Sequence, residues 1–584
     1  MPPMRALLRW SLLALFVGAR AQADVPPEVQ LCLQHLKPSE RERAARALGP
    51  LEALPRYRVQ LEVDPKERLV WGKVQVEVTA RNGRPLSELY LRLTPNTRSR
   101  RVTLSQVKLN GQPVTLEPGP ESTLSRVALT PPLAPGASAT LEMSVKATVP
   151  RAPAQSGSLL GGGGAASGGD HGAFSATSDF LSLVGVVPQV PPLDEQGKPW
   201  AGPQGIGDLA LYEPAHVLAT VTVPPGWTAH ATGAPMGEVP EPDGRVRFGF
   251  AAAAVRDFPV FVSRGYRSET TTVNGVTVES HFLPRDEASA QRVLKYATQA
   301  LSEFERRLGP LPYTHFRVVE APLSGGAGGM EFPGLVTVAT SLYRASVDPS
   351  AVLSGMAGME DLQALLGEAG GGAMAQMGAT LERTLEFTVA HEVAHQYFAA
   401  LVGSDPINAP VVDESLAQYA AVLYFEWAHG KAAAERMRRE GLVTPYHFYR
   451  LSGGEDGRAD RATGDFDDEM QYGALVYGKA PMFHHAARQL VGDGPYFQAL
   501  RSYVDTYRFK WTCKECLVKE LAKASPAQAR ALGALRVRWW EEAHGDADLG
   551  APDLGSMMGG LGDMKLDAES RKLLEEILPQ LTGQ

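Results

Sequence analysis

Two histidines four residues apart, His391 and His395, have the residue type and spacing to bind one metal ion. In an α-helix, residues i and i+4 lie on the same face, so both imidazoles can reach one point. Glu392 lies one step round such a helix, and Glu414 follows after residues 396–413. Two imidazoles and one carboxylate hold zinc tetrahedrally and leave its fourth position open, as in catalytic sites. The sequence therefore predicts one Zn²⁺ per chain, bound by His391, His395 and Glu414.

The chemistry that this group could perform is hydrolysis. Zinc lowers the pKa of a bound water towards ~7. Glu392 borders the predicted metal position without occupying it, and its carboxylate can take the proton as the water attacks a carbonyl. We therefore predict that Glu392 is the general base and then the acid that protonates the leaving amine.

Two packed helices are needed to bring these residues together. The first should end at Gly403, with Pro406 beyond it. The second should run from Glu414 to His429, because this stretch is mostly apolar and has no Gly or Pro before Gly430. The first helix is indicated by apolar residues at helical spacing around the histidines: Leu381, Leu385, Val389, Phe398 and Leu401.

The zinc-binding pattern resembles that of a known family. His391-Glu392-Val393-Ala394-His395, followed by Glu414, is similar to the zinc signature of the M1 (gluzincin) aminopeptidases. The resemblance extends over roughly residues 50 to 545. It implies a thermolysin-like α/β catalytic domain and an enzyme that hydrolyses N-terminal residues of peptides.

An upstream glycine-rich segment adds to the resemblance. Residues 328–334 read Gly-Gly-Met-Glu-Phe-Pro-Gly and resemble the family's Gly-x-Met-Glu-Asn strand. The resemblance implies that Gly329, Met330 and Glu331 bind substrate, with the Glu331 carboxylate on the free α-amine. Such an amine has a pKa near ~8 and is largely protonated at neutral pH, so a carboxylate suits it. The alternative is that Glu331 is an exposed strand residue without this role.

A downstream segment, Tyr477-Gly478-Lys479-Ala480, resembles the family's Tyr-x-Lys-Gly. The resemblance implies that the Tyr477 hydroxyl donates a hydrogen bond to the oxyanion formed as water adds to the carbonyl. Tyr472 is the alternative donor. His484 and His485 are predicted to be packing or surface residues, because adjacent helix positions cannot both face one metal.

Departures from the family pattern leave alternatives open. Phe332 stands in place of Asn, Ala480 stands in place of Gly, and Phe180–Pro192 offers no acid as a second amine anchor. We predict a zinc-dependent metallopeptidase acting as an aminopeptidase, with a zinc endopeptidase of relaxed cleft as the alternative. A catalytically silent peptide-binding protein on the same fold is a further alternative. Glu392 and Tyr477 argue against it, because a binder needs neither.

Composition and the N-terminus bear on partners and location. The 584 residues carry a formal net charge of −8 with mixed signs, which argues against nucleic acid and polybasic membrane binding. An apolar run from Trp10 to Val17 precedes Ala21-Gln22-Ala23, as in a secretory signal peptide. We therefore predict a signal peptide at 1–23, export to the periplasm or the extracellular space, and no stable membrane span after cleavage. An uncleaved anchor is the alternative, although the run is shorter than the ~20 residues a span needs.

The texture of the sequence predicts a multidomain α+β protein. Alternating residues predict strands at 57–63 and 73–78, and Asn-Gly pairs at 110–111 and 274–275 predict tight hairpin turns. An antiparallel β-sandwich or saddle should precede the catalytic domain and a short C-terminal helical region. The predicted boundaries are 24–49 for a helical lead-in, 50–284 for the β domain with a Gly-rich loop at 156–172, 285–485 for the catalytic domain, 486–544 for the helical region, and 545–584 for a flexible tail that can form one last helix.

Two further features have open interpretations. Three cysteines are too few for a disulfide framework. Cys513 and Cys516 could form a local disulfide, a metal pair or two thiols without function, and Cys32 is left unpaired. The Gly-, Met- and Ala-rich insert 354–380 is either a helical flap above the site or a solvent loop.

Overall fold

The fold is described from a computed structural model, which places residues 25–81, 83–152, 171–202, 206–207, 211–347, 371–550 and 552. The predicted signal peptide (1–23), residues 156–170 of the Gly-rich loop, residues 354–370 of the insert and the tail from 553 onward lie outside the described residues. Within the described ranges, no helix has both the length and the apolar character needed to cross a membrane.

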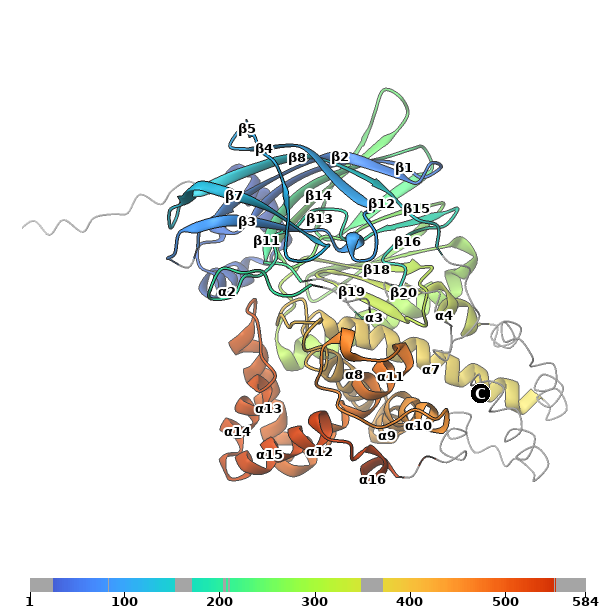
Figure 1. Ribbon diagram of the computed structural model, residues 1–584. Coiled ribbons are helices and arrows are strands. Elements are labelled where there is room, and N and C mark those ends of the chain that lie inside the picture. The colour runs from blue at the N-terminus through green and yellow to red at the C-terminus, as the bar shows by residue number, and fades with distance from the viewer. Residues whose placement is uncertain are drawn as a thin grey trace, which may run out of the picture.

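Three layers follow one another from top to bottom in Figure 1: the N-terminal β-sheets, a smaller sheet with two long helices, and a group of C-terminal helices. The N-terminal part begins with α1 (Pro27–Cys32) and α2 (Pro38–Leu48). Its strands are β1 (Arg56–Asp64), β2 (Leu69–Thr79), β3 (Leu86–Arg92), β4 (Val102–Leu109), β5 (Gln112–Pro113), β6 (Glu117–Pro118), β7 (Leu124–Leu133), β8 (Ser138–Thr148), β9 (Phe174–Ala176), β10 (Phe180–Leu183), β11 (Ala215–Val223), β12 (Trp227–Ala231), β13 (Ala234–Pro240), β14 (Val246–Val255) and β15 (Val260–Arg264).

These strands form three sheets in the described part of the chain. The largest has the order β13-β14-β11-β1-β2-β8-β4-β5, and the others are β3-β7-β6 and β12-β15-β10-β9. β1 pairs antiparallel with β2 but parallel with β11, so the large sheet is mixed where a purely antiparallel one was predicted. Parallel neighbours need a long connection, and here the chain from β2 to β10 lies between the two strands.

The alternation that predicted these strands corresponds to their burial. In β1, Val59, Leu61 and Val63 are buried and alternate with more exposed residues, because successive side chains point to opposite faces. Both predicted Asn-Gly turns are present. Asn110 and Gly111 have φ of 50° and 80°, and Asn274 and Gly275 have φ of 48° and 76°, as a type I′ turn requires.

A fourth sheet, of five strands, underlies the predicted catalytic domain. Its strands are β16 (Arg267–Val273), β17 (Val276–Phe282), β18 (His315–Ala321), β19 (Gly329–Phe332) and β20 (Leu335–Ala339). Their order is β16-β17-β18-β20-β19, so the glycine-rich segment forms an edge strand, antiparallel to β20. Helix α3 (Glu287–Leu308) follows the β16–β17 hairpin, and α4 (Thr340–Ala345) follows β20.

Two helices beside this sheet contain the histidines and Glu414. They are α7 (Gly371–His395) and α8 (Glu414–His429), and α8 has the predicted bounds. The prediction that the first helix continues to Gly403 is wrong, because α7 ends at His395. The chain then turns back on itself, with Ala399 at φ 140° and a β-bridge between Phe398 and Val402. Residues 371–380 of the insert are the first turns of α7.

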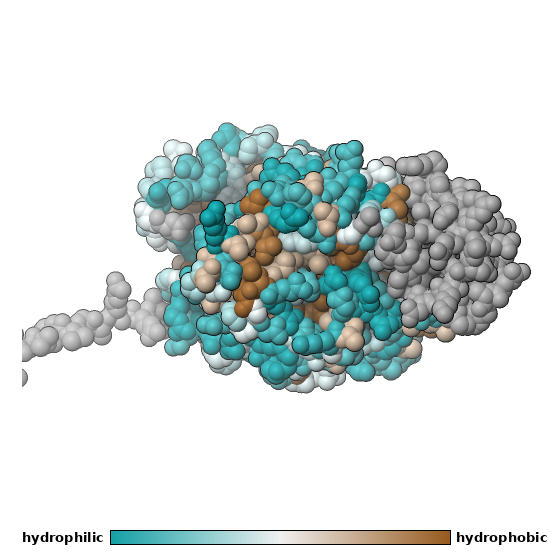
Figure 2. Space-filling model, turned by 90° about the horizontal axis from the view of Figure 1, so that it is seen from below, coloured by the Kyte–Doolittle hydropathy of each residue, from teal (hydrophilic) through white to brown (hydrophobic). Residues whose placement is uncertain are grey.

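The C-terminal layer is helical. Its elements are α9 (Lys431–Met437), η5 (Arg438–Val443), α10 (Thr444–Leu451), α11 (Glu469–Tyr472), η7 (Gly473–Lys479), α12 (Met482–Val491), α13 (Asp493–Tyr507), α14 (Cys516–Ala524), α15 (Ala529–Arg536), η9 (Val537–Glu541) and α16 (Gly545–Leu549). Cys513 and Cys516 form the local disulfide that was one prediction, and Cys32 is a free, buried thiol. The face seen in Figure 2 is mainly hydrophilic, with apolar residues gathered in a central hollow.

Candidate active site

Helices α7 and α8 bring the three predicted ligands to one point. The Nε2 atoms of His391 and His395 lie 3.0 Å apart. Glu414 Oε2 lies 3.5 Å from Nε2 of His391 and 3.3 Å from Nε2 of His395. All three residues are buried. They form the one cluster of metal-ligand type found among the described residues.

These distances fit zinc. Zinc binds imidazole nitrogen and carboxylate oxygen at about 2.0–2.2 Å, so neighbouring ligand atoms of a tetrahedral site lie about 3.3 Å apart. The three observed separations of 3.0, 3.3 and 3.5 Å are close to that value. Two nitrogens and one oxygen also match the donor set of catalytic zinc sites. The predicted ligand set is therefore assembled with the geometry that the ion needs.

A backbone carbonyl orients one of the ligands. His395 Nδ1 lies 2.8 Å from the carbonyl oxygen of Phe398, which can only accept a hydrogen bond. The proton of the neutral ring is therefore on Nδ1, and the Nε2 lone pair faces the other ligands. The turn that ends α7 early places this carbonyl. No side-chain pattern in the sequence could have revealed it.

The buried ligands also shift one another's pKa values. Burial and the neighbouring His395 lower the pKa of His391. Burial acts to lower the pKa of His395, but the charge and hydrogen bond of Glu414 outweigh it and raise that pKa to about 10. Burial acts to raise the pKa of Glu414, but both histidines hold it well below its usual range. A divalent cation competes with a proton on His395, so its binding depends on pH.

Asp413 holds the start of α8, a role that the sequence did not suggest. Its Oδ1 accepts a hydrogen bond from the backbone N–H of Glu414 at 2.9 Å, and its Oδ2 accepts one from the Ser404 hydroxyl at 2.5 Å. Burial and the charge of Glu414 raise the pKa of Asp413 to about 7. Ser404 lies in the loop after α7, so these contacts connect the loop to the third ligand.

Glu392 lies against the edge strand β19. A Cβ added to Gly329 would lie 2.2 Å from Glu392 Oε1, and one added to Gly328 would lie 3.0 Å from Thr388 Cγ2. Thr388 and Glu392 are one turn apart on α7. The two glycines therefore allow the strand to lie directly on the helix, with the Glu392 carboxylate where a side chain of residue 329 would be.

The Glu331 side chain points to the side of β19 on which Glu392 of α7 lies. Successive residues of a strand face opposite sides, so Gly329 and Glu331 share one face, and Met330 and Phe332 share the other. Met330 and Phe332 are both buried, whereas Glu331 is partly exposed. The side chain of Met330 thus packs in the core.

Phe332, which stands where the family has Asn, is also a packing residue. Its ring lies 5.8 Å from that of Phe261 in β15, in an edge-to-face arrangement. This contact joins the edge strand to the N-terminal sheets. The departure from the family pattern therefore has a structural role here.

Tyr477, rather than Tyr472, lies beside the predicted metal position. Its ring centroid is 6.0 Å from that of His391, and it is partly exposed. Tyr472 is buried, with its ring 5.1 Å from Phe466 and its hydroxyl close to Gly207. Tyr477 lies in the π-helical segment η7, a feature frequent at functional sites.

Lys479 holds this segment in place. Its ammonium is buried and donates hydrogen bonds to Asp456 Oδ1 at 2.8 Å, to the carbonyl of Glu542 at 2.9 Å and to that of Gly457. The His484 ring is also buried and shares a hydrogen bond with the Ser415 hydroxyl at 3.0 Å, as expected for a packing residue. Lys479 and His484 therefore support the site without being among its predicted ligands.

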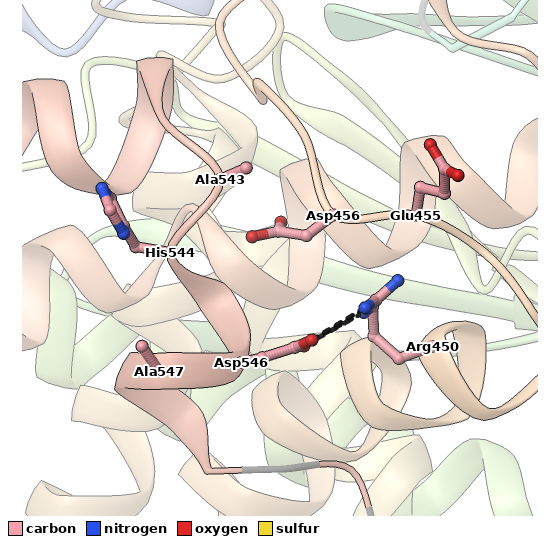
Figure 3. A pocket seen from close by; sticks show the side chains of 7 residues that line it. All are labelled: Arg450, Glu455, Asp456, Ala543, His544, Asp546 and Ala547. Carbon is pink, nitrogen blue, oxygen red and sulfur yellow. Dashed lines mark hydrogen bonds and ion pairs between the residues drawn. The ribbon is translucent and has the colours of Figure 1, made fainter.

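A separate pocket lies on the other side of Lys479. Its volume is about 460 Å³, and Asp456 in its lining is the partner of Lys479. Figure 3 shows Arg450 and Asp546 paired across it. None of the residues predicted to act in the site lines this pocket. Its lining consists of Arg450, Glu455, Asp456, Ala543, His544, Asp546 and Ala547.

One part of this chain matches the model of a known protein family. Residues 355–539 match the model of the peptidase family M1 domain. The matched part is similar to a peptidase family M1 domain. It contains the three predicted ligands, Glu392 and Tyr477, and it begins after the 328–334 segment. The resemblance is thereby confirmed, and with it the class of enzyme, a zinc metallopeptidase.

Solved M1 structures share the fold over most of the chain. The M1 zinc metallopeptidase from Deinococcus radiodurans matches with a TM-score of 0.54 and 20% identity, covering 83% of this chain and 94% of that one. A mutant of an M1 zinc metallopeptidase from the same organism, bound to a Tyr-Ser-Ala substrate, matches with a TM-score of 0.53 and 21% identity, covering 84% and 94%. The predicted multidomain architecture is confirmed. No curated protein matches this chain.

Proposed function

We propose that this M1 peptidase is a zinc-dependent aminopeptidase that removes N-terminal residues from peptides. The observation that carries the proposal is the position of β19 along α7. Gly329 touches Glu392, and Glu331 points to the same side of the strand. A carboxylate suited to a substrate ammonium thus shares one face with the carboxylate suited to remove a proton from water.

Glu392 carries out the proton transfers in this proposal. Zinc held by His391, His395 and Glu414 would supply Lewis-acid activation of a water. Glu392 borders the ligands on α7 and takes the proton from this water as it attacks the scissile carbonyl. The same carboxyl then gives a proton to the leaving amine.

Tyr477 acts on the oxygen of the scissile carbonyl. Its ring is near His391, and its phenol can donate a hydrogen bond as negative charge develops on that oxygen. Lys479 keeps the π-helical segment in place through its three hydrogen bonds, and this limits the reorganisation needed during the reaction.

Glu331 and the edge of β19 select the substrate's N-terminus. β20 covers one edge of β19, and the other edge is the end of the sheet in the described residues. An extended peptide can add to such an edge through backbone hydrogen bonds. The Glu331 carboxylate then pairs with the α-ammonium. This pairing limits how many residues lie on the N-terminal side of the scissile bond.

The endopeptidase alternative has specific support. Phe332 packs against Phe261 instead of supplying a polar side chain, and residues 180–192 contain no second acid. An amine anchor of one carboxylate discriminates less sharply between free and blocked N-termini. We therefore expect a preference for free amines that is weaker than two acids would provide.

We also propose that the protein is exported. The support is the signal-like N-terminus together with the Cys513–Cys516 disulfide, since disulfides persist in oxidising compartments. N-terminal sequencing of protein recovered from the expressing cells' periplasm or medium should give Asp24 as the first residue. Recovery from the cytoplasm alone, beginning at Met1, would contradict export.

The activity is tested with chromogenic aminoacyl substrates and short peptides, each with a free or an N-acetylated amine. Free-amine substrates should be cut and acetylated ones cut poorly. A chelator should abolish hydrolysis and added Zn²⁺ should restore it, with one zinc per chain by elemental analysis. Internal cleavage of blocked peptides at the rate seen for free ones would favour the endopeptidase.

A further inference from the structure

Gln396, the residue after the second predicted zinc ligand, is fully buried. Both ends of its side-chain amide are hydrogen-bonded to the backbone where β19 turns into β20. Its Nε2 donates a hydrogen bond to the carbonyl of Phe332 at 3.0 Å. Its Oε1 accepts a hydrogen bond from the N–H of Gly334 at 2.8 Å. Phe332 ends β19, and Gly334 lies in the turn to β20. One amide thus spans the turn that ends the strand.

Gln396 directly follows the last residue of α7 and extends a row of residues on this helix that faces β19. Thr388 and Glu392 are four residues apart on α7 and lie on one face of it. Gln396 follows Glu392 by four residues, in the turn that ends the helix. The first contacts Gly328, the second contacts Gly329, and the third bonds to the end of the strand. Helix and strand therefore run side by side, and Gln396 supplies the polar contact of the row with the strand's end.

We propose that Gln396 is a positioning residue that sets the register of β19 against the zinc helix, and through it the place of Glu331. This inference rests on the proposed aminopeptidase function. Glu331 is one residue from Phe332, so a slide or tilt of the strand's end moves its carboxylate. The distance from that carboxylate to the predicted ligands determines which bond of a bound peptide reaches them.

The chemistry of the contact explains the residue type. A carboxamide offers a donor and an acceptor on one short group, which matches a backbone carbonyl and a backbone N–H. A Glu would place an acceptor against the Phe332 carbonyl. An Asn is one methylene shorter, and a Met has the length without either hydrogen bond. Buried partners left without hydrogen bonds are costly, so the turn would shift to reach other groups.

The turn between β19 and β20 has close neighbours on the side away from Gln396. The direction in which the turn would shift without Gln396 is therefore restricted. A Cβ at Gly334 would lie 3.2 Å from the carbonyl oxygen of His315 and 3.4 Å from His35 Nε2. These atoms leave little room for the turn to move towards the sheet. Loss of Gln396 should let it move along α7 instead, and carry Glu331 with it.

The test compares Gln396→Met with wild type in free-amine and N-acetylated substrates. In Gln396→Met, the free-to-acetylated ratio of kcat/KM should fall at least 10-fold, mainly through a higher KM for the free-amine substrate. Zinc should remain at one per chain. In the Glu331→Ala background, Gln396→Met should reduce the ratio by less than 2-fold, because the residue acts through Glu331. Hydrogen exchange should speed up in residues 330–336 specifically.

Asn96→Leu is the matched control. The Asn96 amide also bonds to backbone at both ends, donating to the carbonyl of Val102 at 3.0 Å and accepting from its N–H at 2.9 Å, but it lies between β3 and β4 in the N-terminal part. This variant should lower thermal stability without changing the ratio. Gln396→Asn, a milder change, should move the ratio in the same direction by a smaller factor and serves if the Met variant does not fold.

The outcomes separate two failures. If wild type prefers free amines and Gln396→Met keeps that preference, the positioning role is wrong while the aminopeptidase proposal stands. Loss of zinc in Gln396→Met and Gln396→Asn would also overturn it, because the residue would then serve the metal. If wild type shows no preference, the aminopeptidase proposal fails, and the positioning role fails with it.

Discussion

At the scale of single residues, the site depends on charges held in a buried group. Glu414, His391 and His395 lie close together. Glu414 acts to raise the pKa of both histidines, both histidines lower that of Glu414, and His395 lowers that of His391. Glu392 and Tyr477 border this group from α7 and η7. In the proposed mechanism their contributions are separable, because Glu392 would act on the proton of water and Tyr477 on the oxygen of the carbonyl.

Glu392→Gln should retain zinc and lose the base. The amide has almost the same shape but cannot accept the proton, so kcat should fall by at least ~10²-fold. Elemental analysis should still find one zinc per chain, whereas His391→Ala should lose the metal. Hydrolysis by Glu392→Gln at the wild-type rate would refute the assignment of the base.

Tyr477→Phe should lower kcat by about 10²–10³-fold, because it removes one oxyanion donor with little change in shape. KM should change far less, since this hydrogen bond matters mainly in the transition state. Steady-state kinetics of both tyrosine variants checks the register. A normal kcat in Tyr477→Phe with a large loss in Tyr472→Phe would assign the role to Tyr472.

Glu331→Ala should damage the hydrolysis of free-amine substrates selectively. Stranding one charge of a desolvated pair costs ~2–5 kcal/mol, so kcat/KM for free-amine substrates should fall by at least ~30-fold. N-acetylated substrates lack the charge and should be little affected. Parallel losses on both substrate types would show that Glu331 has a structural role only.

At the scale of elements, the site includes a direct contact between one strand, β19, and one helix, α7. β19 lies on α7 because Gly328 and Gly329 present no side chains to it. Among the described residues β19 is an edge strand, and we propose that a peptide adds to its outer side, while Gln396 holds its end. The short turn after His395 supplies both the carbonyl that orients His395 and the position of Gln396.

Gly329→Val should displace the base without removing any reacting group. The added side chain would overlap Glu392 Oε1, Cδ and Cγ, which lie 2.2, 2.4 and 2.7 Å from its Cβ position. A misplacement of about 1 Å typically costs ~10²-fold in rate, so kcat should fall by about that factor. Zinc content and melting temperature distinguish this from misfolding. An unchanged kcat would mean that Glu392 functions from another position.

At the scale of the whole molecule, distant segments meet around the catalytic layer. Arg508, after α13, pairs with the buried Glu40 of α2 at 2.8 Å. Arg256, after β14, stacks at 4.1 Å on Trp511, and the backbone of Gly403 bridges to the same loop. These contacts connect the N-terminal helix α2 and the N-terminal sheets to the C-terminal helices. They also connect the C-terminal part to the loop that follows α7.

His216 predicts a pH dependence of the chain's stability. Burial lowers its pKa from 6.5 to about 4, and its Nε2 contacts the carbonyl of Leu51 at 2.9 Å. The unfolded state therefore binds more protons between pH 6.5 and 4, and this residue's contribution is lost as the pH falls through that range. His216→Gln should make the pH profile shallower by up to ~1.4 kcal/mol per pH unit. Urea unfolding at pH 5, 6 and 7 measures it, and parallel profiles would contradict it.

Local and chemical features of this protein can be read from its amino-acid sequence. The four-residue spacing of His391 and His395 predicts that both lie on one face of a helix. The alternation of polar and apolar residues at 57–63 predicts a strand with one buried side. The Asn-Gly pairs determine their turns because both residues tolerate positive φ. Each of these features depends on neighbours in the chain, so a short stretch of sequence is enough to identify the motif residues.

Features that depend on residues far apart in sequence are set by the tertiary structure. The end of α7 at His395 is set by packing of the following turn, although apolar spacing continues to Leu401. The parallel pairing of β1 with β11 joins segments more than 150 residues apart. The roles of Gln396, Asp413 and Phe332 come from partners on other elements. Hydrogen bonds and packing across such distances leave no periodic trace in one sequence, because each partner's own neighbours do not encode the contact.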